Sequence, residues 1–479
     1  MRLPPAQPSL NRAVLWVLPR LCPQLSLTDT MNNTSSKVKT PLFYGWVVVI
    51  AAFLIALMGY GMRYSFSVFY VVTLNEFGWS RASTAGAFST ALIIYGIGAP
   101  IAGSMVDRVG SKLAIIVGGF LLATGLALLS QASAIWHFYL FFGLLVALGT
   151  CFVGNASLIP LLSNWFVRRR GTAIGLYFAA VAGAPALAPV IQYLIDTLGW
   201  RSAYLVLAAM AVVVIVALAA LLLRPRPEAM GLLPDGVAPS GLRGSPVPGA
   251  GHADDLVVDR AWVSRQWTVG QAMRTRQFWA LVFANLFLGA EMNLLYMHQV
   301  AHAVDVGFSQ GLASSALGLA GLATMLGALG GFVSDRIGRE STYTIGVVGS
   351  ILGILVLTMM QQVSQLWMLY FYAICFGFFY GLSTPAIISS HADIFLGKTF
   401  GAINGCFLAG FGVGGAIGPY LGGYFYDAVG SYTFPFILAM FLAAASGTCL
   451  WVAAPRRIRL VAGRASYRLE AHNGGTPLP

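Results

Sequence analysis

Charged side chains are scarce in this chain, at 9% of its 479 residues, whereas hydrophobic residues account for 58%. Soluble domains contain about 25% charged residues, so the composition excludes a soluble protein of this length. Short segments of alternating polarity, which are typical of transmembrane strands, are also missing. These absences leave a membrane protein built from apolar helices.

The sequence motifs of enzymes and metalloproteins are missing as well. The five cysteines are scattered and show neither metal-ligand spacing nor a disulfide framework. The chain contains no phosphate-binding loop of the form Gly-x-x-x-x-Gly-Lys, and no nucleophile–base or metal constellation is visible. We therefore predict that the protein is not an enzyme and that it uses no metal or other cofactor.

Twelve apolar stretches have the length, about 20 residues, that crosses the hydrocarbon layer. They predict an all-α membrane protein with two pseudo-symmetric bundles of six transmembrane helices each. The predicted spans cover roughly residues 43–72, 82–106, 112–131, 136–162, 171–195, 201–223, 277–301, 311–333, 342–362, 366–389, 399–424 and 431–453. The predicted domains are an N-terminal segment without regular structure over 1–42, a first bundle over 43–223, a linker over 224–274, a second bundle over 275–454 and a tail over 455–479.

Positive charge is concentrated on one side of the predicted membrane. The termini, the linker and the loops on their side contain 25 of the 28 Lys and Arg residues. Because Lys and Arg accumulate in cytoplasmic loops, we predict a cell (inner) membrane protein with both termini in the cytoplasm. The net charge of +12 follows from this distribution and does not indicate nucleic acid. Val14–Leu18 is too short for a signal peptide, and Met31 is an alternative start to Met1.

One loop motif occurs twice, once in each predicted half. Its copies are Gly103-Ser-Met-Val-Asp107-Arg108-Val-Gly110 and Gly331-Phe-Val-Ser-Asp335-Arg336-Ile-Gly338. Such a motif can act as a conformational latch, because its glycine allows close helix contact, its aspartate can meet a helix N-terminus and its arginine can meet a carboxylate. The repeat predicts two related halves with a substrate site between them, near the membrane midplane.

Arg63 and Glu291 are the only formal charges that we place inside the predicted spans. The separation between them along the chain equals the separation between Asp107 and Asp335, so they occupy equivalent places in the two halves. A charge in hydrocarbon costs at least about 2.5 kcal/mol, so such residues are rare without a role. Whether the two side chains contact each other stays open from the sequence, because a register error of one residue turns a side chain by about 100°.

The loop motif resembles the signature of the major facilitator superfamily, which implies the major facilitator fold. Further motifs resemble the monocarboxylate porters and the related bacterial oxalate–formate antiporters. These motifs are Gly45-Trp46-Val-Val-Val, Trp165-Phe166-Val-Arg168-Arg169-Arg170-Gly-Thr-Ala173-Ile-Gly175, Arg226-Pro-Glu228-Ala-Met-Gly231 and Thr275-Arg276-Gln-Phe-Trp279. The resemblance covers roughly residues 43–455 and implies a small carboxylate as the substrate.

Arg63 occupies the place where porters of this type often have a span-1 lysine. Helical spacing puts Tyr60, Tyr64, Ser67 and Tyr70 on the same face as Arg63. A guanidinium can bind a carboxylate through two hydrogen bonds, so we predict that Arg63 binds the substrate beside Tyr60, Tyr64 and Ser67. The alternative is that Arg63 extends outward from a long helix to the membrane surface.

Glu291 lies in the middle of predicted span 7, with His298 on the same helical face. A carboxyl group in hydrocarbon without a cation is expected to be protonated, because burial disfavours the charged form. We predict that Glu291 and His298 provide proton coupling or the counter-charge of Arg63. The alternative is a purely structural Glu–Arg pair that joins spans 1 and 7.

Three uncharged residues, Asn155, Tyr380 and Asn404, are further candidates for substrate contact, although each suits helix packing equally well. Porters and antiporters of this group have charged residues in spans 8 and 11, where this chain has Ala323, Gly327 and Phe411. A single intramembrane cation favours a monoanion over the dianion oxalate.

The sequence therefore predicts secondary active transport of a small monocarboxylate such as lactate or pyruvate, by alternating access and with proton coupling. The expected partners are the carboxylate, the proton and the lipid bilayer, and the protein is expected to be monomeric. The alternatives are a carboxylate exchanger of the oxalate–formate type, an efflux carrier for amphiphilic cations and a membrane sensor that binds without translocating.

Overall fold

The computed structural model describes residues 43–166, 169–236, 257–397 and 399–461, which belong to one compact unit. The predicted N-terminal segment over 1–42, including both candidate start methionines, lies outside the described residues. The middle of the predicted linker and most of the predicted tail also lie outside them.

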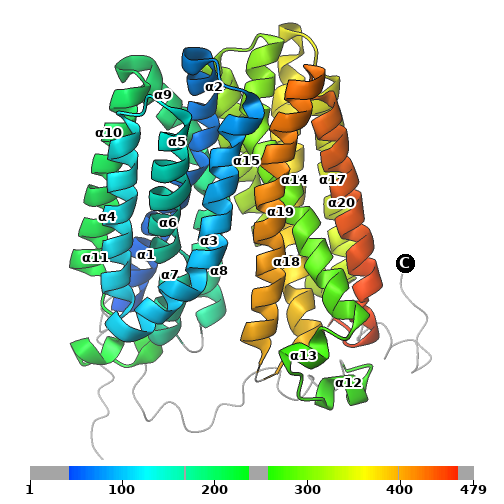
Figure 1. Cartoon of the computed structure of the whole chain (residues 1–479). Helices are drawn as coiled ribbons and strands as arrows, with labels where there is room; N and C mark the ends of the chain where they lie inside the picture. The colour runs from blue at the N-terminus through cyan, green and yellow to red at the C-terminus, as the bar shows by residue number, and fades with distance from the viewer. Residues whose placement is uncertain (1–42, 167–168, 237–256, 398, 462–479) are drawn as a thin grey trace, which may run out of the picture. The chain divides into compact units, whose positions relative to one another are not determined.

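Twelve helices of the described chain are long and apolar enough to cross a membrane, which confirms the predicted fold class. They cover Tyr44–Phe77, Arg81–Val109, Ser111–Leu129, Ile135–Trp165, Arg170–Leu198, Trp200–Leu222, Arg276–Val306, Gln310–Ile337, Arg339–Met359, Val363–Phe395, Phe400–Val429 and Thr433–Arg457. Figure 1 shows spans 1–6 in one group and spans 7–12 in the other. Spans 1, 7, 8, 10, 11 and 12 continue four to six residues past their predicted ends, because a helix can extend beyond the apolar stretch that identifies it.

Spans of the first half contain several interruptions. The elements are α1 Tyr44–Tyr64, α2 Phe66–Phe77, α3 Arg81–Val109, α4 Ser111–Leu129, α5 Ile135–Phe138, the π-helix η1 Tyr139–Val146, α6 Ala147–Val153, α7 Asn155–Trp165, α8 Arg170–Gly183, the 3-10 turn η2 Ala184–Leu187, α9 Ala188–Leu198, α10 Trp200–Met210, the π-helix η3 Ala211–Val216 and α11 Ala217–Leu222. Proline explains the break in span 5, because Pro185 and Pro189 have no N–H to donate to the helical ladder.

Spans of the second half are mostly continuous. They consist of α14 Arg276–Val306, α15 Gln310–Leu329, α16 Phe332–Ile337, α17 Arg339–Met359, η7 Val363–Gln365, α18 Leu366–Phe395, α19 Phe400–Val429, α20 Thr433–Ala453 and η8 Pro455–Arg457. The linker contributes the short helices η4 Pro227–Met230, η5 Pro234–Gly236, α12 Arg260–Ser264 and α13 Val269–Ala272. Figure 1 places α12 and α13 at one end of the bundle, which we name the linker end; the opposite end is the far end.

The closing glycine of each loop motif forms a one-residue connection between two spans. Gly110 separates α3 from α4 with a φ of 85°, and Gly338 separates α16 from α17 with a φ of 105°. Other residues rarely adopt such positive φ values, so the turn requires glycine at both places. The two copies of the motif therefore share a backbone geometry as well as a sequence.

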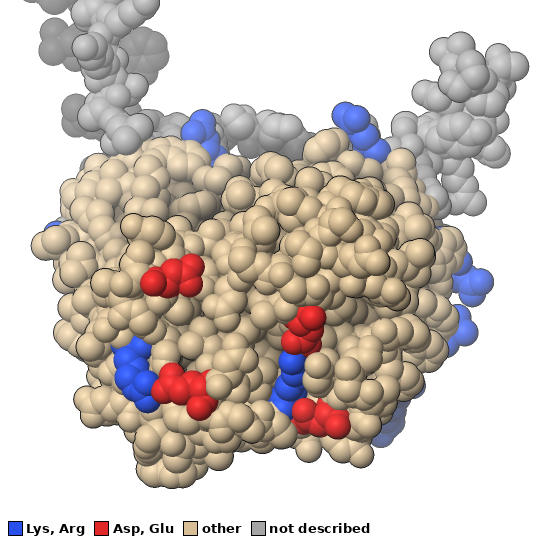
Figure 2. Space-filling view, turned by 90° about the horizontal axis from the view of Figure 1, so that it is seen from above, with Lys and Arg blue, Asp and Glu red and all other residues tan. Residues whose placement is uncertain are grey.

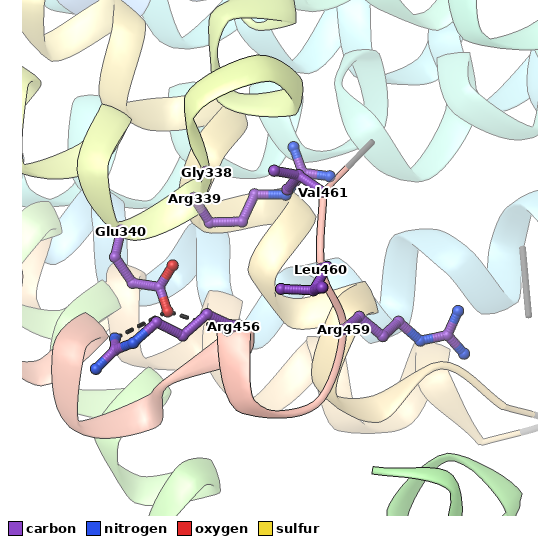
Figure 3. A pocket seen from close by; sticks show the side chains of 7 residues that line it. All are labelled: Gly338, Arg339, Glu340, Arg456, Arg459, Leu460 and Val461. Carbon is purple, nitrogen blue, oxygen red and sulfur yellow. Dashed lines mark hydrogen bonds and ion pairs between the residues drawn. The ribbon is translucent and has the colours of Figure 1, made fainter. Parts of the chain in front are cut away.

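Ion pairs and hydrogen bonds fasten the linker end of the second half. Arg456 donates from its backbone N–H (3.0 Å) and from its guanidinium (3.1 Å) to Oε1 of Glu340. Figure 3 shows Arg456 beside Glu340, with Arg459 directed away from them. Val258 in the linker donates to the carbonyl of Ile458 at 2.9 Å, so linker and tail are bound together.

Spans 7 and 11 approach each other through glycine. A methyl group on Gly414 would overlap the backbone carbonyl of Leu286, and one on Gly418 would overlap the carbonyl of Ala290. Small residues allow this backbone contact between membrane helices, where packing rather than water drives association. The contact fixes α14, which carries Glu291, against α19.

Substituting Gly414 with alanine is expected to destabilise the protein by about 1–3 kcal/mol, the usual cost of overpacking a tight contact. Gly412→Ala is the matched control, because a methyl group at Gly412 of the same helix meets nothing within 4 Å. Thermal unfolding of both variants in detergent checks the prediction. Equal unfolding temperatures for the two variants would show that spans 7 and 11 accommodate the extra methyl group without loss of stability.

Candidate functional site

Arg63 is buried inside a cage of tyrosines. Its side chain is 4% exposed, and its guanidinium carbon lies 5.6 Å, 5.1 Å and 5.1 Å from the ring centroids of Tyr60, Tyr64 and Tyr95. Aromatic faces attract a cation at such distances, and more strongly where water is excluded. Arg63 does not extend to the membrane surface, so the alternative of an outward-reaching arginine is wrong for this structure.

The positive charge of Arg63 has no carboxylate beside it. Among the described residues, no Asp or Glu forms an ion pair with Arg63, and its buried Nε has no hydrogen-bond partner. A buried cation without an anion is costly, because its hydration is lost and the aromatic faces around it replace that hydration only in part. The cage is therefore suited to an anion that binds and leaves.

Hydroxyl groups beside Arg63 are linked into a network around Asn155. The hydroxyls of Tyr60 and Tyr95 lie 2.8 Å apart, Tyr60 donates to Oδ1 of Asn155 at 3.4 Å, and Tyr177 donates to the same oxygen. Asn155 begins α7 directly after Gly154, whose backbone leaves the helical region and interrupts span 4. The sequence predicted Tyr60, Tyr64 and Asn155 for this site, but Tyr95 and Tyr177 were missed.

The predicted face of span 1 divides at Ser65, where α1 ends and α2 begins. Ser67 donates its hydroxyl to the carbonyl of Tyr64 at 3.0 Å. Tyr70 donates to the carbonyl of Arg81 at 3.1 Å and has its ring 5.7 Å from that of His298. Of the tyrosines on this face, Tyr60 and Tyr64 thus contact the guanidinium, while Tyr70 belongs to a network at the far end.

Glu291 is buried within the second half, at 2% exposure. Its Oε1 has no hydrogen-bond partner among the described residues. In the described part of the chain, no ion pair joins Glu291 to Arg63. Within the described residues the structure therefore lacks the structural Glu–Arg pair that the sequence left open, and Glu291 forms no ion pair there.

Aromatic rings connect the Arg63 cage to span 7. The ring of Tyr64 meets that of Tyr296 edge-on at 5.7 Å, and the Tyr296 hydroxyl lies 2.9 Å from Oγ1 of Thr324. Tyr296 is on the same helix as Glu291, five residues later. The two buried charges are thus on opposite sides of one aromatic contact between the halves.

The remaining predicted site residues lie in the second half. Tyr380 donates its hydroxyl to the sulfur of Met292 at 3.0 Å, one residue from Glu291. Asn404 forms a separate cluster, in which its Oδ1 lies 2.9 Å from Nδ1 of His391 and Asn285 Nδ2 lies 3.0 Å from Nε2 of the same histidine. Asn404 has polar partners of its own and is not part of the Arg63 cage.

The two copies of the loop motif differ in their contacts. Asp335 accepts from Arg339 at 2.5 Å, and Arg339 also donates to Asp393 of span 10 at 2.8 Å. Arg336 lies over the ring of Phe332.

In the first copy, Asp107 and Arg108 are exposed, and neither forms an ion pair within the described residues. Gly331 lies close to Pro385, whereas a methyl group on Gly103 would meet nothing within 4 Å.

In the described chain, twelve apolar helices in two halves, with a buried cation in the first half, define a multi-pass membrane protein of the transporter class. The family model described as Major Facilitator Superfamily matches residues 51–331 and 325–469. The chain belongs to the major facilitator superfamily.

Within this superfamily the chain is similar to proteins named as monocarboxylate transporters. It is 28% identical to monocarboxylate transporter 13 of Rattus norvegicus over 414 residues, which cover 85% of this chain and 88% of the relative. It is 27% identical to monocarboxylate transporter 11 of Homo sapiens over 428 residues, which cover 87% and 84% of the two chains.

A solved structure shares the fold. It is a bacterial homolog of the human lysosomal transporter Spinster in an inward-facing and unoccupied conformation, with a TM-score of 0.64 and 17% identity. The match covers 89% of this chain and 98% of the bacterial protein.

Proposed function

We propose that this protein moves a small monocarboxylate such as lactate or pyruvate across the cell membrane by alternating access, and that Arg63 binds the carboxylate. The observation that carries the proposal is the buried guanidinium with three tyrosine rings around it and no carboxylate of the described chain beside it. A guanidinium matches the two oxygens of a carboxylate, and the hydroxyls of the cage supply further donors.

Similarity to the named monocarboxylate transporters supports this substrate class. The excess of Lys and Arg on one side supports an orientation in which the linker end and both termini are cytoplasmic. The protein would act as a monomer and as a carrier rather than an enzyme, with Tyr60, Tyr64, Tyr95, Tyr177 and Asn155 lining the substrate site.

Glu291 is the proposed proton carrier. It is buried in the second half and forms no ion pair among the described residues, and carboxyl groups inside membrane bundles commonly serve as proton relays. Tyr64 and Tyr296 connect it to the Arg63 cage, so occupation of one site can influence the other.

Uptake of labelled lactate and formate into proteoliposomes, with and without an inward proton gradient, tests the proposal. Accumulation driven by the gradient supports proton-coupled symport. Uptake that ignores the gradient but requires unlabelled acid inside would favour the carboxylate exchanger. No uptake of either acid would overturn the substrate class.

A further inference from the structure

At the far end, a single arginine of the first half binds several side chains of the second half. Arg81, the first residue of α3, donates to Oδ1 of Asp305 at 2.8 Å and to the hydroxyl of Tyr432 at 2.6 Å. Its guanidinium carbon lies 3.8 Å from the ring centroid of Tyr426. Figure 2, which looks onto this end, shows mixed groups of blue and red side chains on this face, and an acidic side chain that stands alone.

Asp427 of α19 binds the backbone of the same segment. Its carboxylate accepts from the N–H groups of Arg81 (3.0 Å) and Ala82 (2.8 Å). The first N–H groups of a helix have no partner within the helix, and the helix dipole favours a negative charge there. Asp427 therefore caps a helix that belongs to the other half. Gly423 makes this approach possible, because a methyl group on it would lie 2.7 Å from the backbone of Ala82.

The network continues into span 7 through His298. Nε2 of His298 lies 2.8 Å from the carbonyl oxygen of Pro419, which can only accept, so Nε2 donates. Nδ1 then accepts from the hydroxyl of Tyr432, at 3.2 Å. Arg81 is thereby connected to α14, the helix that carries Glu291, through Tyr432 and His298 as well as directly through Asp305.

A related contact exists at the other boundary between the halves. Gln310 begins α15 as Arg81 begins α3, and it accepts at Oε1 from Nε2 of Gln192 at 3.1 Å. The same Nε2 donates to Asp196 at 2.7 Å, and Asp196 lies close to the end of α9 as Asp427 lies close to the end of α19. The first residues of α3 and α15 thus both bond across a boundary between the halves, but through different contacts: Arg81 brings a cation, whereas Gln310 brings a neutral amide.

We infer that Arg81 is the latch of a gate at the far end: it holds spans 7, 11 and 12 against span 2, and its bonds must break before the central site opens to that side. Hydrogen bonds to charged groups are roughly twice as strong as neutral ones, so the Arg81 copy resists opening more than the Gln310 copy. The inference rests on the proposed function in one respect: the gate leads to the proposed carboxylate site. Opening of the gate is measured without any substrate, so failure of the latch and failure of the substrate assignment can be told apart.

Labelling of a buried cysteine from the far side tests the latch in the full-length chain in membranes. Leu92→Cys provides the reporter, because Leu92 is 3% exposed, faces Gly415 of span 11 and lies eleven residues, about 16 Å, into α3 from Arg81. A membrane-impermeant maleimide is added from outside, and labelling of the same chain without the reporter is subtracted. Gln131→Cys, at an exposed far-end position, verifies that the reagent reaches this side.

Arg81→Ala is expected to raise the labelling rate of the reporter about tenfold or more, and Gln310→Ala by less than a third of that effect. The matched control is Arg201→Ala, because Arg201 pairs with Glu76 at 2.6 Å on the same face but within one half. Its labelling rate should stay within about twofold of the parent.

If Arg81→Ala does not accumulate in the membrane, Asp305→Asn removes the ion pair while leaving Arg81 and the Asp427 cap in place, and a rise of about threefold is expected. If the Leu92→Cys reporter is labelled at the parent rate in both Arg81→Ala and Asp305→Asn, the proposed latch is overturned. An equal rise of the labelling rate in Arg201→Ala would also overturn the latch, because loss of any ion pair at the far end would then expose the reporter.

Discussion

Replacing Arg63 with alanine is expected to lower the carboxylate uptake rate at a fixed low substrate concentration by at least about 30-fold. Removing one partner of a buried, hydrogen-bonded charge pair typically costs about 2–5 kcal/mol, and nothing else in the described cage carries a positive charge. Arg63→Lys should retain part of the activity with a KM raised about tenfold, since an ammonium is a point charge that cannot form the two parallel bonds. Initial rates in proteoliposomes over a range of lactate concentrations check both variants.

Arg201→Ala serves as the matched control for Arg63, because it removes an arginine whose side chain is 47% exposed and lies outside the cage. Its uptake should equal that of the parent. Thermal unfolding of Arg63→Ala in detergent separates loss of binding from loss of fold. Undiminished uptake by a folded Arg63→Ala variant would remove Arg63 from the site and, with it, the basis for the carboxylate assignment.

Replacing Glu291 with glutamine is expected to abolish accumulation driven by a proton gradient while leaving carboxylate exchange intact. Glutamine has nearly the shape of the protonated carboxyl group but cannot release a proton. A gradient of one pH unit can support roughly tenfold accumulation by a one-proton symporter, since one unit corresponds to about 1.36 kcal/mol. The accumulation ratio of the variant should fall to about one, measured with labelled lactate in the same vesicles that report exchange.

Glu340→Gln is the matched control for this substitution. Glu340 is as buried as Glu291, at 2% exposure, but it is paired with Arg456 at the linker end. The control should keep its response to the gradient, although it loses the charge of that ion pair. Gradient-driven accumulation by Glu291→Gln at the parent level would assign Glu291 a structural role and favour another proton carrier.

Helix positions and the duplication could be predicted because both are properties of single segments. An apolar stretch of fixed length identifies a span, and a constant offset between Asp107 and Asp335 identifies the repeat. Helical spacing also placed Tyr60 and Tyr64 beside Arg63. These predictions need no knowledge of which helices become neighbours.

Contacts between helices could not be predicted in the same way. Tyr95 and Tyr177 reach Arg63 and Asn155 from spans 2 and 5, and their own segments show no signal beyond an aromatic residue in an apolar helix. Asn404 looked equivalent to Asn155 as a lone amide in a span, yet its partner is His391. Arg81 lies one residue before a predicted span, and nothing in the sequence indicates its four partners in the other half.

The two halves also differ in how often their helices are interrupted. Within the described chain, spans 1, 4, 5 and 6 of the first half contain a break, a π-helical turn or a 3-10 turn in their interior. In the second half span 8 is divided, and spans 10 and 12 have a 3-10 turn only at one end. Interruptions of the hydrogen-bond ladder are where helices bend at low cost. A cycle of opening and closing would then be an unequal motion: the first half bends around the substrate, and the second half, held by the glycine contact of spans 7 and 11, serves as the rigid frame against which it bends.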